Sequence, residues 1–277
     1  MRIVVTGASG KAGRDVVRDL LEHDHQVLGV DIARPADAPP EFLLADLTEF
    51  GQAAECLSGA DAVVHLAAIP ANRIQTEATT FRTNMLSTYN VFEAARVLST
   101  SRVVWASSET IFGLPFERER PAYAPIDEEH PPYPESSYAV SKLLSEELAR
   151  QLHRWDGRPH VALRFSNIME PDDYQQIPSF WDDPQLRRWN LWGYVDVRDV
   201  SLSCRLALEA DIGAEHFVIA AADTVMNRPS HELMAEVYPS VPYRKGDGEF
   251  DTLLSVDKAR KALGYEPQHS WRDVVAG

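Results

Sequence analysis

The chain has 277 residues, of which 44% are hydrophobic and 25% are charged, and its formal net charge is −15 at pH 7. This length and composition are those of a globular protein with one substantial core. Because so acidic a surface repels phosphate backbones and anionic lipid headgroups, neither nucleic-acid binding nor membrane binding is expected. No apolar run approaches the roughly 18 residues that span a bilayer, no signal peptide is visible, and the two cysteines are far apart; a cytoplasmic protein is expected.

The chain begins with a β-branched run over residues 2–6, then a glycine-rich loop, then apolar residues at helical spacing. A Gly-x-x-Gly-x-x-Gly loop between a strand and a helix is typical of a dinucleotide site. Its glycines permit a tight turn, close approach of a pyrophosphate and close helix packing, and the helix N-terminus attracts the anion. The alternative is a glycine turn without a ligand. We expect the loop to bind a cofactor through Gly7, Ser9, Gly10, Lys11, Ala12 and Gly13.

The second strand, residues 25–31, ends in Asp31. An acid there accepts hydrogen bonds from the adenosine ribose hydroxyls and repels a 2′-phosphate, so NAD is expected as the cofactor. Arg34 would weaken that preference, which leaves NADP open. A third short strand, residues 41–45, is followed by Asp46 and Leu47. Asp46 is interpreted either as a ligand of the adenine amino group or as a helix cap.

Residues 62–66 predict a fourth strand, and small side chains at its end leave room for a cofactor at Leu66, Ala67 and Ala68. His65 is interpreted as a buried, hydrogen-bonded histidine and not as a catalyst. Residues 76–98 predict a long amphipathic helix. Asn84 in this helix is expected to bond across to the active-site strand and to contribute to the cofactor site.

The fifth strand, residues 102–106, leads into Ser107 and Ser108. Ligands of doubly wound sheets bind at the carboxyl ends of strands, so these serines are well placed, although a serine pair also makes an ordinary turn. The proline-rich stretch over residues 112–137 predicts an irregular loop at the active site.

Tyr138 and Lys142 are four residues apart on the next expected helix, which runs to about residue 155. This spacing places both side chains on one face, one turn apart. An ammonium group beside a phenol lowers the phenol pKa, which makes Tyr138 a candidate general acid/base near neutral pH. Ser108 would give a second hydrogen bond to the same oxygen.

The remaining elements predict two regions. A sixth strand (160–165), a helix that residues 193–200 lead into and that runs to about 210, and a last strand (215–220) complete a nucleotide-binding sheet. Residues 166–192 predict an irregular lid, and 229–237 and 256–263 predict two helices. The fold class expected is α/β, a Rossmann doubly wound parallel sheet with a small C-terminal substrate-binding region. The cofactor domain is placed at residues 1–165, with 194–222 returning to it, and the substrate-binding region at 166–193 and 223–277.

Several motifs, in this order, resemble an extended short-chain dehydrogenase/reductase of the NAD-dependent epimerase/dehydratase family. They are the glycine loop, the Asp31 strand end, His65-Leu66-Ala67-Ala68, Ser107-Ser108 before Ile111-Phe112-Gly113, and Tyr138-x-x-x-Lys142; Leu163–Asn167 and Tyr194–Val200 extend the match to about residue 220. The resemblance implies that Tyr138 exchanges a proton with a substrate hydroxyl, Lys142 holds the nicotinamide ribose and Ser108 orients the substrate oxygen. It also implies a homodimer through the helices at 76–98 and 137–155.

The substrate end is less defined. Substrate contacts are expected from Ser108, Glu109, Asn167 and Trp192, and no metal site is expected. Family members that act on nucleotide sugars are usually longer, so a free sugar, sugar acid or polyol is favoured. Uronate dehydrogenases are expected to carry an arginine soon after the sixth strand, and residues 170–178 contain none, which leaves Arg73, Arg187 or Arg188 as candidates. Thr110 stands where the sugar dehydratases carry glutamate, which argues against that chemistry.

Three functions follow from these observations. The first is an NAD-dependent oxidoreductase that transfers hydride between NAD and a hydroxyl of a small sugar-like molecule. The second is a nucleotide-sugar epimerase that retains its NAD. The third, less favoured because the tyrosine and lysine are both present, is an NAD-sensing regulatory protein.

Overall fold

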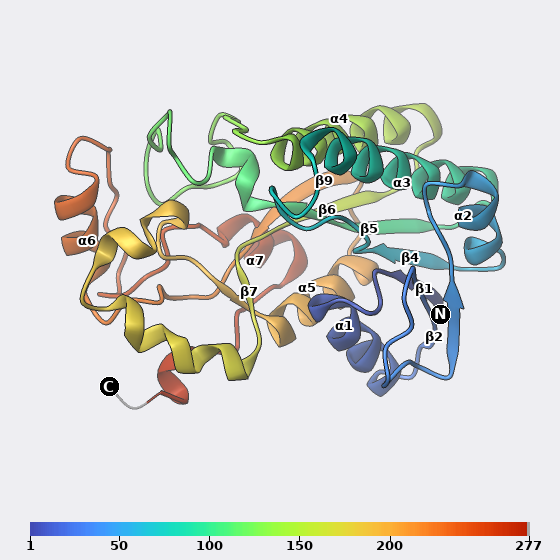
Figure 1. Cartoon of the computed structure of the whole chain (residues 1–277), viewed down its shortest axis with the longest axis horizontal. Helices are drawn as coiled ribbons and strands as arrows, with labels where there is room; N and C mark the ends of the chain where they lie inside the picture. The colour runs from blue at the N-terminus through green and yellow to red at the C-terminus, as the bar shows by residue number, and fades with distance from the viewer. Residues whose placement is uncertain (276–277) are drawn as a thin grey trace.

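Seven parallel strands form the central sheet, in the order β3-β2-β1-β4-β5-β6-β9 (Figure 1). The structure, a computed structural model, describes residues 1–275. The strands are β1 (Arg2–Thr6), β2 (Gln26–Asp31), β3 (Glu41–Leu44), β4 (Ala62–His65), β5 (Arg102–Ser108), β6 (His160–Phe165) and β9 (Ala214–Ile219). The order reverses between β1 and β4, so the predicted doubly wound Rossmann sheet is confirmed.

Helices cover both faces of this sheet (Figure 1). One face carries α1 (Lys11–Glu22) and α5 (Val197–Glu209), and the other carries α2 (Phe50–Leu57), α3 (Glu77–Val97) and α4 (Ser137–Asp156). Because both faces are buried, the strands are apolar without alternation. In β1, Ile3 and Val5 pack in the core on the α1 side, whereas Val4 between them packs in the core on the α3 side.

The ends of the two long helices follow from their caps. The side chain of Thr76 accepts a hydrogen bond from the Thr79 N–H, so α3 begins one residue later than the expected range. The Ser136 hydroxyl likewise accepts from the Ala139 N–H at 3.1 Å and starts α4. This cap places Tyr138 in the first turn of α4, close to the end of β5.

The segments that belong neither to the seven-stranded sheet nor to its flanking helices pack against the hydrophobic core on the α1 side of the sheet. A two-stranded sheet joins β7 (Ile168–Met169) to β8 (Val195–Asp196), and α6 (Ser230–Val237) and α7 (Asp257–Leu263) follow. Between β7 and β8 the chain forms short 3-10 turns at Pro171–Phe180, Pro184–Leu186 and Arg188–Asn190. The segment is irregular as expected, but its inner face is packed, with Tyr174, Ile177, Leu191 and Trp192 buried.

Among the helices that the structure describes, none combines the length and the apolar composition needed to cross a bilayer.

Candidate active site

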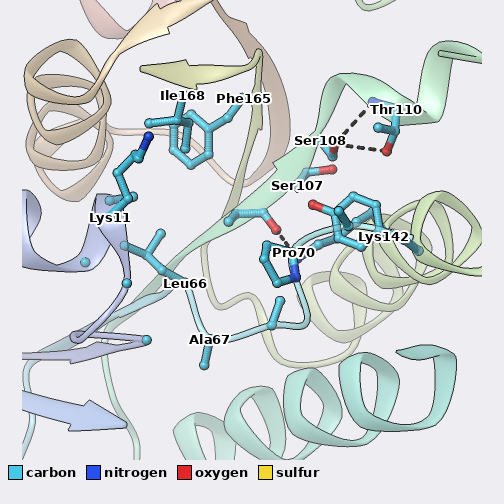
Figure 2. A pocket seen from close by; sticks show the side chains of 18 of the residues that line it. Lys11, Leu66, Ala67, Pro70, Ser107, Ser108, Thr110, Lys142, Phe165 and Ile168 are labelled. Atoms are coloured by element: carbon cyan, nitrogen blue, oxygen red, sulfur yellow. Dashed lines mark hydrogen bonds between the residues drawn. The ribbon is translucent and has the colours of Figure 1, made fainter. Parts of the chain in front are cut away.

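A cavity of about 960 Å³ lies at the carboxyl ends of the strands, with Lys11 on one side and Ser108 and Lys142 on the other (Figure 2). Most of the residues expected to bind cofactor or substrate line it. These are Gly7, Ser9, Gly10, Lys11, Ala12, Gly13, Asp31, Asp46, Leu47, Leu66, Ala67, Ala68, Ser108, Glu109, Tyr138, Lys142 and Asn167. Sequence reasoning missed other lining residues, among them Thr110, Pro115, Phe165, Ser166 and Trp189. Only their position beside Ser108 or after the sixth strand could have indicated them.

The glycine loop has the shape that a pyrophosphate site requires. Gly7 has φ +70°, and a Cβ on it would lie 2.7 Å from the Ala67 nitrogen; a Cβ on Gly13 would lie 2.0 Å from the Gly7 oxygen. The N-cap of α1 is Gly10, which offers no side-chain cap, and the first turn of α1 contains no acid. The first N–H groups of α1 are therefore left for an anionic ligand. These residues fit the phosphates of a dinucleotide.

Two carboxylates lie where the cavity meets the ends of β2 and β3. Asp31 accepts hydrogen bonds from the backbone N–H of Ser9 at 3.0 Å and of Ile32 at 2.7 Å, which holds its carboxylate at the cavity wall. The Arg34 guanidinium lies over the ring of Phe42, 5.1 Å from its centroid. Asp46 Oδ1 accepts from both the N–H and the hydroxyl of Thr48, so Asp46 shapes the turn before α2 and also lines the cavity.

At the other end of the cavity lie Ser108 at the end of β5 and, one turn apart on α4, Tyr138 and Lys142, all three at least nine-tenths buried. The ammonium of Lys142 donates to the Ala106 carbonyl oxygen at 2.7 Å, and it lies 5.7 Å from the Tyr138 ring centroid. Burial lowers the pKa of Lys142 to about 8. Burial also raises the pKa of Tyr138 to about 12; a hydrogen bond with Ser108 lowers it and the Glu109 charge raises it. The expected lowering of the tyrosine pKa is therefore wrong, because burial has the largest effect on the phenol pKa and raises it.

Thr110 fixes the direction of the Ser108 hydroxyl. Ser108 Oγ accepts the Thr110 N–H at 3.2 Å and the Thr110 hydroxyl at 2.9 Å (Figure 2). A hydroxyl has two acceptor lone pairs and one hydrogen. With both lone pairs engaged, the Ser108 hydrogen is left for donation toward the phenol oxygen or a substrate.

Two expected site residues do not line the cavity. The amide of Asn84 accepts from the Ile69 N–H at 2.8 Å and donates to the Ile69 carbonyl at 3.1 Å and to Ser141 Oγ at 3.5 Å. Asn84 therefore braces the loop after β4 against α4 and reaches neither the cavity nor β5. Trp192 is fully buried, and its indole N–H donates to the Pro184 carbonyl at 2.8 Å. A turn with positive φ at Leu191 and Trp192 directs this indole into the core, so its placement at the substrate is wrong.

Other side chains resolve questions that the sequence left open. His65 is buried between the hydroxyls of Thr6, at 2.7 Å, and Thr88, at 3.3 Å, as the interpretation of a hydrogen-bonded core histidine requires. None of the three arginines considered for a substrate carboxylate lines the cavity in the described part of the chain. Arg73 and Arg188 are exposed, while the buried Arg187 donates to the Gly193 carbonyl.

Comparison with known proteins identifies related chains. Residues 3–220 match the model of the NAD dependent epimerase/dehydratase family. The L-arabinose 1-dehydrogenase (NAD(P)(+)) of Haloferax volcanii is 26% identical over 281 residues, with 99% of each chain covered. A short-chain dehydrogenase/reductase superfamily protein from Agrobacterium tumefaciens, crystallised with NAD, superposes with a TM-score of 0.76 at 25% identity, covering 98% of this chain and 94% of that one.

A crystal structure of UDP-galactose 4-epimerase is also similar, with a TM-score of 0.72, 29% identity, and 98% of this chain and 94% of the epimerase covered. This epimerase is nearly as short as the present chain. Chain length alone therefore does not exclude a nucleotide-sugar substrate, contrary to the expectation from the sequence.

Proposed function

Because the chain belongs to the NAD-dependent epimerase/dehydratase family, we propose that it is a dehydrogenase that oxidises one hydroxyl of a small sugar or polyol with NAD. One observation carries the choice of a small substrate. The cavity that contains Ser108, Tyr138 and Lys142 is lined at its substrate end by Phe165–Ile168 and Trp189, and no described residue beyond Trp189 lines it. The C-terminal region, residues 223–275, thus offers no wall for a nucleotide diphosphate in this cavity.

The side chains divide the work between binding and proton transfer. When bound, NAD supplies the hydride acceptor. The N–H groups at the start of α1 hold the pyrophosphate. Asp31 accepts hydrogen bonds from the adenosine ribose hydroxyls, which favours NAD over NADP. Arg34 lies over the ring of Phe42 and does not oppose this preference. Lys142 holds the second ribose.

The reacting oxygen is served by Tyr138 and Ser108. Tyr138 takes the proton of the substrate hydroxyl during oxidation and returns it in the reverse reaction. Ser108 donates a hydrogen bond to the same substrate oxygen. The two hydrogen bonds that Ser108 Oγ accepts from Thr110 favour this donation, because they leave the hydroxyl hydrogen of Ser108 for the substrate. With the pKa of Tyr138 raised to about 12, the phenol of the cofactor-free protein is protonated at neutral pH. Oxidation, which needs the phenolate, is therefore expected to accelerate as the pH rises.

The test follows NADH absorbance while the purified protein and NAD are mixed with free sugars, uronic acids, polyols and nucleotide sugars. A steady rise with one small substrate supports the dehydrogenase. Interconversion of epimers without NADH accumulation would replace it with the epimerase, which the likeness to UDP-galactose 4-epimerase favours. Tight NAD binding without turnover of any compound would favour the NAD-sensing protein.

We also propose that the protein is a cytoplasmic homodimer that pairs through α3 and α4. Both cysteines are free and buried, as suits a reducing compartment. The two helices and their ends carry exposed large apolar side chains, namely Phe81, Leu86, Tyr89, Val97, Leu98, Leu144 and Trp155. Pairing would remove this surface from water. Light scattering should give twice the chain mass, and Leu144→Asp should shift it toward the monomer; a monomeric wild-type protein would contradict the pairing.

A further inference from the structure

A buried polar cluster lies against the substrate end of the cavity. It joins Glu109, which follows β5, to Ser166 after β6 and to Arg187 and Asn190 from the turns before β8, all with 8% exposure or less. Glu109 and Ser166 line the cavity together with Ser108 and Tyr138, whereas Arg187 and Asn190 lie behind them. The proposed mechanism gives none of these four residues a role.

Two side chains of the cluster are held by hydrogen bonds to the backbone. Arg187 and Asn190 both donate to the Gly193 carbonyl, at 3.1 and 2.8 Å. Other polar atoms of the cluster have no partner within the described residues: Glu109 Oε2, Ser166 Oγ, Arg187 Nε and Asn190 Oδ1. Buried polar atoms in native proteins are nearly always satisfied by protein, water or ligand. Glu109 and Ser166 also line the cavity, so this cluster of polar groups lies next to the space that a bound substrate would occupy.

The carboxyl of Glu109 is close to the reacting group. Its charge acts on the Tyr138 phenol and raises the phenol pKa. Burial raises the pKa of Glu109 to about 7, while Ser166, the Arg187 charge, Asn190 and the Asn167 backbone act in the opposite direction. Above neutral pH Glu109 therefore presents a carboxylate at the substrate end of the cavity, and a carboxylate accepts hydrogen bonds from hydroxyl groups.

The same wall has no cation for an acidic substrate. Lys11 and Lys142 are the cationic side chains among the described residues that line the cavity. Lys11 pairs with Asp173 at 2.5 Å, at the glycine-loop end, and Lys142 donates to the Ala106 carbonyl. A sugar carboxylate at the substrate end would lie beside the Glu109 carboxylate, and no cation of the cavity lining there would offset the repulsion between the two charges.

We infer that Glu109 is a specificity-determining residue that binds hydroxyl groups beside the oxidised carbon and thereby selects neutral sugars or polyols over sugar acids. The inference rests on the proposed dehydrogenase function for the position of the oxidised carbon. Ser166 adds a hydroxyl to the same subsite, and the Arg187 charge and Asn190 favour the ionised form of the Glu109 carboxyl.

The first experiment compares neutral aldoses with their uronic acids, such as galactose with galacturonate, as ratios of kcat/KM at pH 8.5. For the wild-type protein the neutral sugar should be favoured at least about tenfold, as like charges in a partly buried site repel strongly. Glu109→Gln, which removes the charge and keeps the shape, should bring the ratio within about threefold and raise KM for the neutral sugar. Glu109→Asp, which keeps the charge, should preserve the discrimination. Glu117→Gln, an exposed carboxyl of the proline-rich loop that does not line the cavity, is the matched control and should leave the ratio unchanged.

The ratio should also depend on pH in one direction. Protonation of Glu109 below pH 7 removes its charge, so wild-type discrimination should weaken from pH 8.5 to pH 6. The ionisable groups that face this carboxyl, Arg187 and Tyr138, keep their protonation in that range, because the Tyr138 pKa is about 12 and a guanidinium remains charged. Lys142, whose pKa burial lowers to about 8, also gains a proton over this interval. The Glu109→Gln ratio measures that contribution alone and should change less than the wild-type ratio.

Calorimetric titration of the NADH-loaded protein with the same sugar pairs separates this inference from the proposed function. If no alcohol is oxidised but neutral sugars bind more tightly than uronates and Glu109→Gln removes the difference, the dehydrogenase proposal fails and the subsite remains supported. Equal or tighter binding of uronates by the wild-type protein would overturn the subsite, as would an unchanged ratio in Glu109→Gln. If that variant does not fold, Ser166→Ala should weaken binding of the neutral sugar several-fold, and no change would overturn the shared hydroxyl subsite.

Discussion

Replacing Tyr138 with phenylalanine removes one oxygen from the centre of the proposed site and leaves the ring in place. The Ser108 hydroxyl lowers the pKa of the phenol, and the ring is about nine-tenths buried beside Lys142. Loss of one hydrogen bond destabilises the fold by roughly 0.5–1.5 kcal/mol. Loss of a positioned general acid/base lowers the rate by about 10²- to 10⁴-fold, or roughly 3–5 kcal/mol in the barrier. The effect on catalysis should therefore greatly exceed the effect on stability.

The assay follows NADH formation with the best substrate found, alongside NADH binding by fluorescence and thermal unfolding. Tyr138→Phe should keep the NADH dissociation constant within about threefold, as expected if the dinucleotide is held chiefly by the glycine loop and Asp31. Tyr133→Phe is the matched control: it lies in the proline-rich loop, does not line the cavity, and should keep activity within about twofold. A Tyr138→Phe protein with more than a third of wild-type kcat would refute the assigned proton transfer.

Three further predictions test the surroundings of the site. Thr110→Val should lower kcat about five- to tenfold, because the Ser108 hydroxyl loses a donor that fixes its direction, while Thr110→Ser should restore it; equal kinetics of the two variants would contradict this reasoning. Gly13→Ala should weaken NAD binding at least about tenfold and destabilise the fold by about 1–3 kcal/mol, because its Cβ would lie 2.0 Å from a backbone oxygen; Gly51→Ala in α2, with nothing within 4 Å of its Cβ, should be neutral or slightly stabilising by calorimetry. Burial lowers the pKa of His65 to about 3, so the folded protein keeps this histidine neutral, while the unfolded chain protonates it below a pH of about 6.5. The His65 contribution to the free energy of unfolding is therefore fully present above that pH and decreases on acidification, by about 2 kcal/mol at pH 5. Urea unfolding should show a loss between pH 7.5 and 5 that is smaller by this amount in His65→Gln, and an equal loss would exclude the histidine as its source.

The sheet was predictable because its physical requirements leave a direct mark on the sequence. Strands buried on both faces must be largely apolar. β1 is a short β-branched run followed at once by Gly7, and β4 is a short, mostly apolar run with Ala67 and Ala68 soon after its end. The loop after β1 needs glycine at two positions where a Cβ would strike the backbone. Element ends differ by a residue or two, because a cap such as Thr76 belongs to the helical pattern while its own backbone is extended.

The grouping of Ser108, Tyr138 and Lys142 was predictable from the sequence, but the pKa shifts of Tyr138 and Lys142 were not. A spacing of four residues places Tyr138 and Lys142 on one face of a helix, whatever surrounds them. The direction of each pKa depends on burial and on which atom the ammonium faces, and the Ala106 carbonyl that it faces comes from β5. Such a contact between distant segments has no local signal in the sequence. Burial, which the spacing of four residues does not reveal, has the largest effect on the pKa of each group.

The segment between β6 and β8 shows why chemistry was easier to infer than substrate. Its short 3-10 turns have no sustained period, so nothing in the sequence distinguishes Trp189, which lines the cavity, from Trp192, which fills the core. The same segment supplies the groups behind Glu109, which itself follows directly on the catalytic strand. The residues proposed for proton transfer therefore come from β5 and α4. The proposed surroundings of the substrate come largely from an irregular segment that can change without disturbing them. A family with one reaction apparatus and many substrates is the expected result of this division, and substitutions behind Glu109 should alter substrate preference before they alter proton transfer.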